Sequence, residues 1–214
     1  MEEFENKNAS APERAQTDGA APERAAEGGG MQSLYEWVRS LASAILLLVL
    51  VFTFAARVMD VQGPSMRSTL EEGDRLLVVN ATLVREYRQG DVVVARRQTF
   101  SDEPIVKRVI AVAGQTVDID FAEGTVYVDG EELEEDYINE RTYTWEGVTF
   151  PLTVEEGCLF LMGDNRNMST DSRDTRIGQV DERELIGRAV LILFPGPDAV
   201  TEQRDFSRIG TLKG

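Results

Sequence analysis

An uninterrupted apolar run near the N-terminus constrains this chain more than any other feature. Residues 40–56 contain no charged side chain and lie between Arg39 and Arg57. As a helix, these seventeen residues would span about 25 Å, slightly less than the ~30 Å hydrocarbon core of a bilayer. The run is long for a cleaved signal peptide, and no basic segment precedes it. The sequence therefore predicts one transmembrane anchor over residues 37–58.

The segment that precedes the anchor, residues 1–36, is acidic. It holds eight Asp or Glu residues and three Lys or Arg residues, and most of its apolar content is Ala. Such a segment buries too little apolar surface to offset the entropy of ordering. The motif Ala-Pro-Glu-Arg-Ala occurs at 11–15 and again at 21–25, which is too few copies for a solenoid. We expect a disordered acidic tail.

From residue 59 onward the pattern changes to short apolar runs separated by turn residues. The runs that predict strands are residues 76–79, 91–95, 105–113, 116–120, 125–128, 150–154, 158–162 and 186–193. Asp129-Gly130 predicts a tight hairpin, and no long amphipathic helix pattern follows the anchor. The predicted fold class is mainly β, an antiparallel and partly closed β domain over 59–214, with a smaller inserted subregion at 121–157.

Composition excludes several classes of function. The net charge of −16 at pH 7 argues against nonspecific nucleic-acid binding, which needs clustered Lys and Arg. Cys158 is the only cysteine, so no intrachain disulfide forms, and its apolar neighbours predict a core position. The chain has no histidine, which excludes a Ser-His-Asp triad, a Cys-His pair and Cys/His zinc sites.

Ser65 lies in the turn sequence Gly63-Pro64-Ser65-Met66, eight residues after Arg57. Gly63 allows unusual backbone dihedrals and Pro64 fixes the turn, so the Ser65 hydroxyl is presented at a loop tip. A serine in such a turn is most often structural. If it is a nucleophile, it needs a base other than histidine, and a desolvated lysine is the best remaining candidate.

Lys107 lies within the predicted strand 105–113. Strand alternation places Ile105, Lys107 and Val109 on one apolar face. Burial there would lower the pKa of Lys107 and allow it to act as a base near neutral pH. Arg108 should point to the opposite face and pair with an acid. The alternative is a lysine on an edge strand whose ammonium reaches solvent.

A polar segment at residues 163–173 directly follows the apolar run 158–162. It does not fit a calcium loop, because it lacks the glycine at position six and the glutamate at position twelve. It can instead form a polar network around a lysine, with a hydroxyl on the ammonium and Asp–Arg pairing behind it.

Together, and in this order, these segments resemble the bacterial type I signal peptidases of the single-anchor Gram-positive kind. The resemblance covers roughly residues 35–195, and the matching segments are 63–70, 73–74, 90–93, 106–114 and 163–173. It implies a serine protease with a Ser/Lys dyad that removes signal peptides from exported preproteins. It also implies a preference for small residues before the scissile bond, and no metal or other cofactor.

The resemblance assigns roles to individual residues. It implies that Ser65 is the nucleophile and that Lys107 is the general base. It further implies that the Ser169 hydroxyl orients the lysine and that Asp171 and Arg173 form a supporting ion pair.

Further site residues follow from the same resemblance. Asp164 and Arg166 are expected as supporting residues, and Met66 is expected at the substrate-binding face. The backbone N–H of Ser65 would be one oxyanion donor. Some members of the family carry a serine at the position of Gly63, and its hydroxyl is the second oxyanion donor. Gly63 has no hydroxyl, so the resemblance does not identify the second donor in this chain.

The resemblance also implies partners and a location. The partners are secretory preproteins, cytoplasmic membrane lipid and the protein-export translocon. The acidic tail would lie in the cytoplasm and the β domain on the outer face of the membrane. Two alternatives stay open: a repressor-type self-cleaving Ser/Lys protease, and an anchored β-domain receptor without catalytic activity.

Overall fold

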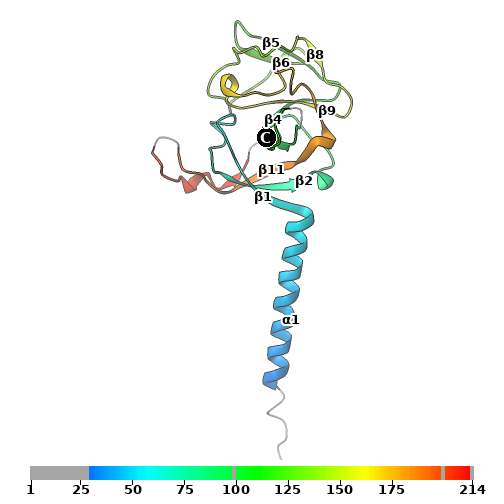
Figure 1. The fold of residues 1–214 in the computed structure, drawn as a ribbon, viewed down its shortest axis with the longest axis vertical. Coiled ribbons are helices and arrows are strands. Elements are labelled where there is room, and N and C mark those ends of the chain that lie inside the picture. The colour runs from blue at the N-terminus through cyan, green and yellow to red at the C-terminus, as the bar shows by residue number, and fades with distance from the viewer. Residues whose placement is uncertain (1–28, 98–99, 199–200, 213–214) are drawn as a thin grey trace, which may run out of the picture. The chain divides into compact units, whose positions relative to one another are not determined.

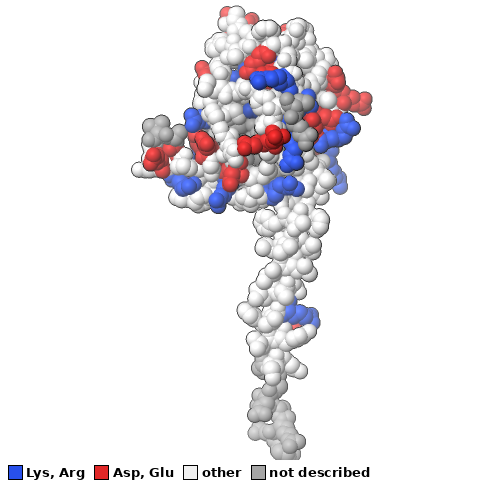
Figure 2. Space-filling model, in the orientation of Figure 1, with Lys and Arg blue, Asp and Glu red and all other residues white. Residues whose placement is uncertain are grey.

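The N-terminal element is a long apolar helix. The computed structural model describes residues 29–97, 100–198 and 201–212, beginning with the helix α1, Gly29–Leu50, and the π-helical turn η1, Val51–Ala55. Met31–Ala55 is long and apolar enough to cross a membrane. On the face shown in Figure 2, this helix carries almost no charged side chain, whereas charges of both signs are spread over the β unit.

The ends of the helix differ from the predicted boundaries. Residues 29–36, expected in the disordered tail, are helical, because extending an existing helix costs far less than nucleating one. The rest of the predicted tail lies outside the described residues. At the other end, residues 56–58 of the predicted anchor belong to the strand β1, Ala56–Asp60.

The main body is an antiparallel sheet in which β1 lies at one edge (Figure 1). Its other strands are β2 (Arg75–Asn80), β3 (Val92–Ala95), β4 (Ile105–Val112), β9 (Cys158–Met162), β10 (Val180–Asp181), β11 (Leu185–Phe194) and β12 (Gly210–Thr211). The strand order is β1-β2-β11-β3-β4-β9-β10, with β12 paired to β11. Because β1 and β10 are not paired with each other in the described part of the chain, the sheet stays open. The predicted fold class, mainly antiparallel β and partly closed, is confirmed.

A second, smaller sheet is inserted between β4 and β9. It comprises β5 (Thr116–Asp120), β6 (Thr125–Val128), β7 (Glu131–Glu132) and β8 (Leu152–Thr153), in the order β7-β6-β5-β8. Asp129 and Gly130 both have positive φ, as a type I′ hairpin turn requires, and they confirm the predicted hairpin. This sheet begins at β5, earlier than the predicted subregion 121–157.

Short 3₁₀ helices connect some of the strands. They are η2 (Ala81–Leu83), η3 (Arg166–Met168), η4 (Glu182–Glu184) and η5 (Phe206–Arg208).

Strand β4 lies in the interior of the large sheet, between β3 and β9. Both of its faces are therefore covered. Val109 packs in one core cluster and Ile110 in another. Cys158 is partly buried against the second of these clusters. Because β4 is not an edge strand, the alternative of a solvent-reaching lysine at position 107 is wrong.

Candidate active site

The turn that carries Ser65 is held by the polar segment 163–173. The backbone N–H of Asn165 donates to the Ser65 carbonyl at 3.0 Å, and its side-chain amide donates to the Pro64 carbonyl at 3.0 Å. Gly63 has φ +80° and open space around it, so glycine is required there for its backbone conformation. A serine at this position would be strained, which gives a physical reason for the missing hydroxyl.

Lys107 is a buried lysine in the middle of the sheet. It pairs in register with Val93 of β3, and its residue is 3% exposed. Burial penalises the charged ammonium and lowers the pKa of Lys107 to about 8, although the nearby Asp171 carboxylate acts in the opposite direction. The predicted direction of this pKa shift is confirmed.

Gly163 is the point where the turn, the lysine strand and the polar segment meet. A Cβ atom at Gly163 would overlap the Ser65 carbonyl oxygen and the Ser169 hydroxyl. Arg108 is paired with Met162, so the same register continued by one residue places Lys107 opposite Gly163. The absence of a side chain at Gly163 therefore leaves room for the Ser65 carbonyl and the Ser169 hydroxyl beside it.

Ser169, Asp171 and Arg173 form a buried network. The Ser169 hydroxyl donates to Asp171 at 2.8 Å, and the Gly163 N–H donates to the same carboxylate at 2.9 Å. The guanidinium of Arg173 donates two hydrogen bonds to Asp171, both 2.8 Å. Burial acts to raise the pKa of Asp171, but the hydrogen bonds and the charge of Arg173 outweigh it and hold that pKa below its usual value. The ion pair predicted from the sequence is present.

Arg108 and Asp164 form a second buried ion pair. Arg108 donates through Nε and Nη2 to the two Asp164 oxygens at 2.9 and 2.8 Å, and its guanidinium lies 4.0 Å from the centre of the Tyr137 ring. The prediction that Arg108 pairs with an acid is confirmed, and Asp164 is that acid.

Arg166 is also fully buried. It pairs with Glu135, and it donates hydrogen bonds to the Thr142 hydroxyl at 3.0 Å and to the Gly163 carbonyl at 3.1 Å. Arg166 therefore supports the residue at which the site converges.

The segment 133–147 supplies partners that the sequence did not predict. Besides Glu135 and Tyr137, it provides the Thr144 carbonyl, which accepts from Arg173 at 3.1 Å, and Glu146, 3.9 Å from Arg173. One carboxylate oxygen of Glu146 is buried without a hydrogen-bond partner among the described residues. The segment shows no periodic pattern, and its contacts are long-range, so nothing in its local sequence indicates them.

A cavity of about 310 Å³ lies on the large sheet. Its lining comes from β1, the following Gln62, β2, β3 and the start of β4, and includes Met59, Leu76, Val94 and Val106. Gln62 and Val106 are close in sequence to Ser65 and Lys107, but neither Ser65 nor Lys107 lines the cavity.

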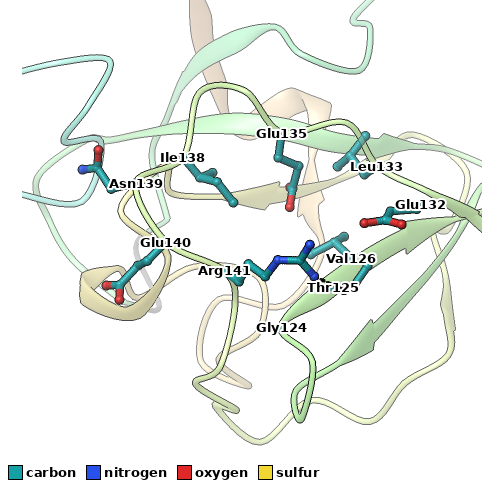
Figure 3. Close-up of a pocket in the computed structure, with 10 residues that line it drawn as sticks. All are labelled: Gly124, Thr125, Val126, Glu132, Leu133, Glu135, Ile138, Asn139, Glu140 and Arg141. Atoms are coloured by element: carbon teal, nitrogen blue, oxygen red, sulfur yellow. Dashed lines mark hydrogen bonds between the residues drawn. The ribbon is translucent and has the colours of Figure 1, made fainter.

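Another cavity, of about 300 Å³, lies in the small sheet and the segment after it (Figure 3). Its lining contains Glu132, Glu135, Glu140 and Arg141, but neither Ser65 nor Lys107. Within the described residues, no group of three His, Cys, Asp or Glu side chains is placed to hold a metal ion.

Residues 34–194 match the family model described as signal peptidase, peptidase S26. The chain belongs to this family. A signal peptidase I of Bacillus licheniformis is 34% identical over 171 residues, which cover 76% of this chain and 90% of that protein. The signal peptidase I T of Bacillus subtilis is 34% identical over 169 residues, which cover 75% of this chain and 85% of that protein.

Two other matches extend this set. A probable signal peptidase I-1 of Synechocystis is 35% identical over 173 residues, covering 77% of this chain and 84% of that one. A crystal structure of a signal peptidase I from Enterococcus faecalis V583 is 29% identical, covers 49% of this chain and 97% of that one, and has a TM-score of 0.42.

Membership of the S26 family decides between the alternatives of the sequence analysis. The chain is a peptidase, so a receptor without catalytic activity is excluded, and the resemblance to bacterial type I signal peptidases is confirmed. Ser65, Lys107 and the whole segment 163–173 lie within the matched residues.

Met66 of this S26 peptidase is a buried residue. Its side chain is 1% exposed and packs in the core cluster with Leu70 and Val78, and its place at the substrate-binding face stays a prediction. An apolar side chain beside a turn gains more free energy in the core than at the surface.

Proposed function

We propose that this S26 peptidase removes signal peptides from exported preproteins, with Ser65 as nucleophile and Lys107 as general base. The observation that carries the proposal is Lys107 itself. It is 3% exposed and its pKa is lowered to about 8, in a chain that has no histidine to serve as the base.

In the proposed mechanism, neutral Lys107 accepts the proton of the Ser65 hydroxyl as Oγ attacks the carbonyl carbon of the scissile peptide bond. The backbone N–H of Ser65 donates to the developing oxyanion. Lys107 then returns the proton to the leaving amine, and an ester joins the signal peptide to Ser65. Lys107 next accepts a proton from water, whose oxygen attacks the ester, and the proton passes to Ser65 as the acid product leaves.

The surrounding network fixes the position of the lysine in this proposal. Asp171 is held by Arg173 and by the Gly163 N–H, and it accepts a hydrogen bond from Ser169. Because the Ser169 hydroxyl donates to Asp171, its oxygen lone pairs are free to accept a hydrogen bond from the Lys107 ammonium. Ser169 thus orients the base.

The edge strand β1 and the adjacent cavity support the substrate class. Among the described strands β1 is paired only with β2, so an extended substrate can add to its open edge through main-chain hydrogen bonds. Residues 58–60 of β1 also line the 310 Å³ cavity, which would receive a substrate side chain.

The apolar helix anchors the enzyme in the cytoplasmic membrane in this proposal. The tail lies in the cytoplasm and the β unit on the outer face, where preproteins emerge from the export translocon. Location at the membrane brings the peptidase to signal peptides that are themselves embedded in the bilayer.

Incubation of the detergent-solubilised full chain with a preprotein tests the proposal. We expect a single cut between the signal peptide and the mature protein, identified by sequencing the new N-terminus. Ser65→Ala should lose at least ~10³-fold in rate, as for one member of a catalytic unit, with an unchanged thermal melt. Cleavage by Ser65→Ala near the wild-type rate would refute the dyad.

A further inference from the structure

A basic pocket of about 420 Å³ lies at one end of the large sheet and shares no residue with the site above. It is lined by Arg57 of β1, Asn80 at the end of β2, Arg96 directly after β3 and residues 183–186 at the start of β11. Strand pairing brings these positions together. In particular, the backbone N–H of Arg96 donates to the Glu184 carbonyl at 2.9 Å.

Two arginines of this pocket are electrostatically uncompensated. Arg183 is paired with Asp181, and Glu184 is paired with Arg97 at 2.6 Å. Arg57 and Arg96 form no ion pair with any described residue. In a chain with a net charge of −16, most arginines have a nearby acid available, so two free guanidinium groups in one pocket indicate an external anion.

The pocket also offers a neutral hydrogen-bond donor. The side-chain oxygen of Asn80 accepts hydrogen bonds from the backbone N–H and the hydroxyl of Thr82. This fixes the orientation of the amide and leaves its NH₂ group as a donor. Two planar guanidinium groups and one amide match the several acceptor oxygens of a phosphate.

The position of Arg57 in the chain indicates where such a phosphate would be. Arg57 is the second residue after Ala55, the last residue of the membrane-length helix Met31–Ala55. Two residues span at most ~7 Å, so Arg57 lies at the depth of lipid headgroups if the helix crosses a bilayer. Leu83, a neighbour of Asn80 in sequence, is an exposed apolar residue, as is common at a membrane interface.

We propose that this pocket binds the phosphate of an anionic phospholipid in the leaflet next to the β unit. The proposal rests on the membrane anchoring included in the proposed function. It does not depend on the Ser65/Lys107 chemistry. A soluble phosphate would present the same oxygens, but the membrane-length helix that ends two residues before Arg57 favours the lipid.

Native mass spectrometry of the full chain, released from micelles containing equal phosphatidylglycerol and phosphatidylcholine, tests this site. We expect the wild type to retain phosphatidylglycerol preferentially, and the double variant Arg57→Gln/Arg96→Gln to lose on the order of 30-fold of that preference, which corresponds to about 1 kcal/mol of headgroup attraction for each of the two removed charges. Arg85→Gln is the matched control, because Arg85 is an exposed arginine outside the pocket that also forms no ion pair with the described residues. It should behave as the wild type.

Three further measurements separate the possible outcomes. Preprotein cleavage in detergent at the wild-type rate would show that the double variant is folded. Ser65→Ala should retain lipid as the wild type does, whether or not Ser65 and Lys107 form the dyad, because lipid binding does not depend on the cleavage chemistry. Excess inorganic phosphate should leave lipid retention unchanged. Equal retention by the wild type and the double variant, or displacement of lipid by inorganic phosphate, would overturn the proposal.

Discussion

At the scale of single residues, the proposed mechanism makes the activity depend on the protonation state of Lys107. Its pKa is lowered to about 8, chiefly by burial, and only the neutral amine can accept the Ser65 proton. We therefore expect kcat/KM to rise about tenfold per pH unit below pH 8 and to level off above it. A pH–rate profile of preprotein cleavage measures this. A rise confined to pH near 10 would show an ordinary, solvated lysine.

Glu146 should influence the same profile. Its negative charge raises the pKa of Lys107, as do the charges of Asp171 and Asp164. The positive charge of Arg173 acts in the opposite direction. Glu146→Gln should therefore lower the pKa of Lys107 and move the rising limb to lower pH, while the plateau rate changes little. Glu156→Gln, which removes an exposed acid, is the control. A profile unchanged in Glu146→Gln would show that this carboxylate does not act on the base.

At the scale of elements, the segment 163–173 is held by buried ion pairs. Removing one partner of such a pair lowers the free energy of unfolding strongly, because the other charge stays buried without its counter-charge. Asp171→Ala would leave the guanidinium of Arg173, which is 0% exposed, without its main acceptor, at a cost of about 3–5 kcal/mol. We expect stability and activity to fall together, measured by thermal unfolding and cleavage rate. Asp60→Ala, which breaks an exposed pair with Arg75, should change stability little. Lost activity with an unchanged melt in Asp171→Ala would indicate a direct catalytic role.

Local sequence patterns predict some strands of this protein but not the contacts between distant segments. Strands such as β4 and β9 are visible because local apolar runs and turn residues determine them. Strand β1 was not predicted, because it follows the apolar helix without a turn signal between them. The buried place of Met66 and the contacts of Glu135 and Glu146 depend on chain segments far away in sequence, which no local pattern encodes.

At the scale of the whole molecule, the substrate-binding region is a property of the assembled sheet. The 310 Å³ cavity is built from β1, β2, β3 and β4, and β2 and β3 are held in place by β11, which pairs between them and comes much later in the chain, so its size is visible only in the folded protein. In contrast, the single membrane-length helix and the order of the motifs are visible in the sequence, because each is local.

The proposed function predicts which preproteins are cut. The resemblance to bacterial type I signal peptidases implies a small residue before the scissile bond, and a bulky side chain there would clash with the subsite that receives it. Steric exclusion discriminates more strongly than the loss of a methyl group. A preprotein series with Ala, Ser, Leu or Phe before the scissile bond should therefore be cut fast for Ala and Ser and at least ~100-fold more slowly for Phe. Equal rates for the Ala and Phe forms would contradict signal-peptide cleavage while leaving a less selective Ser/Lys peptidase.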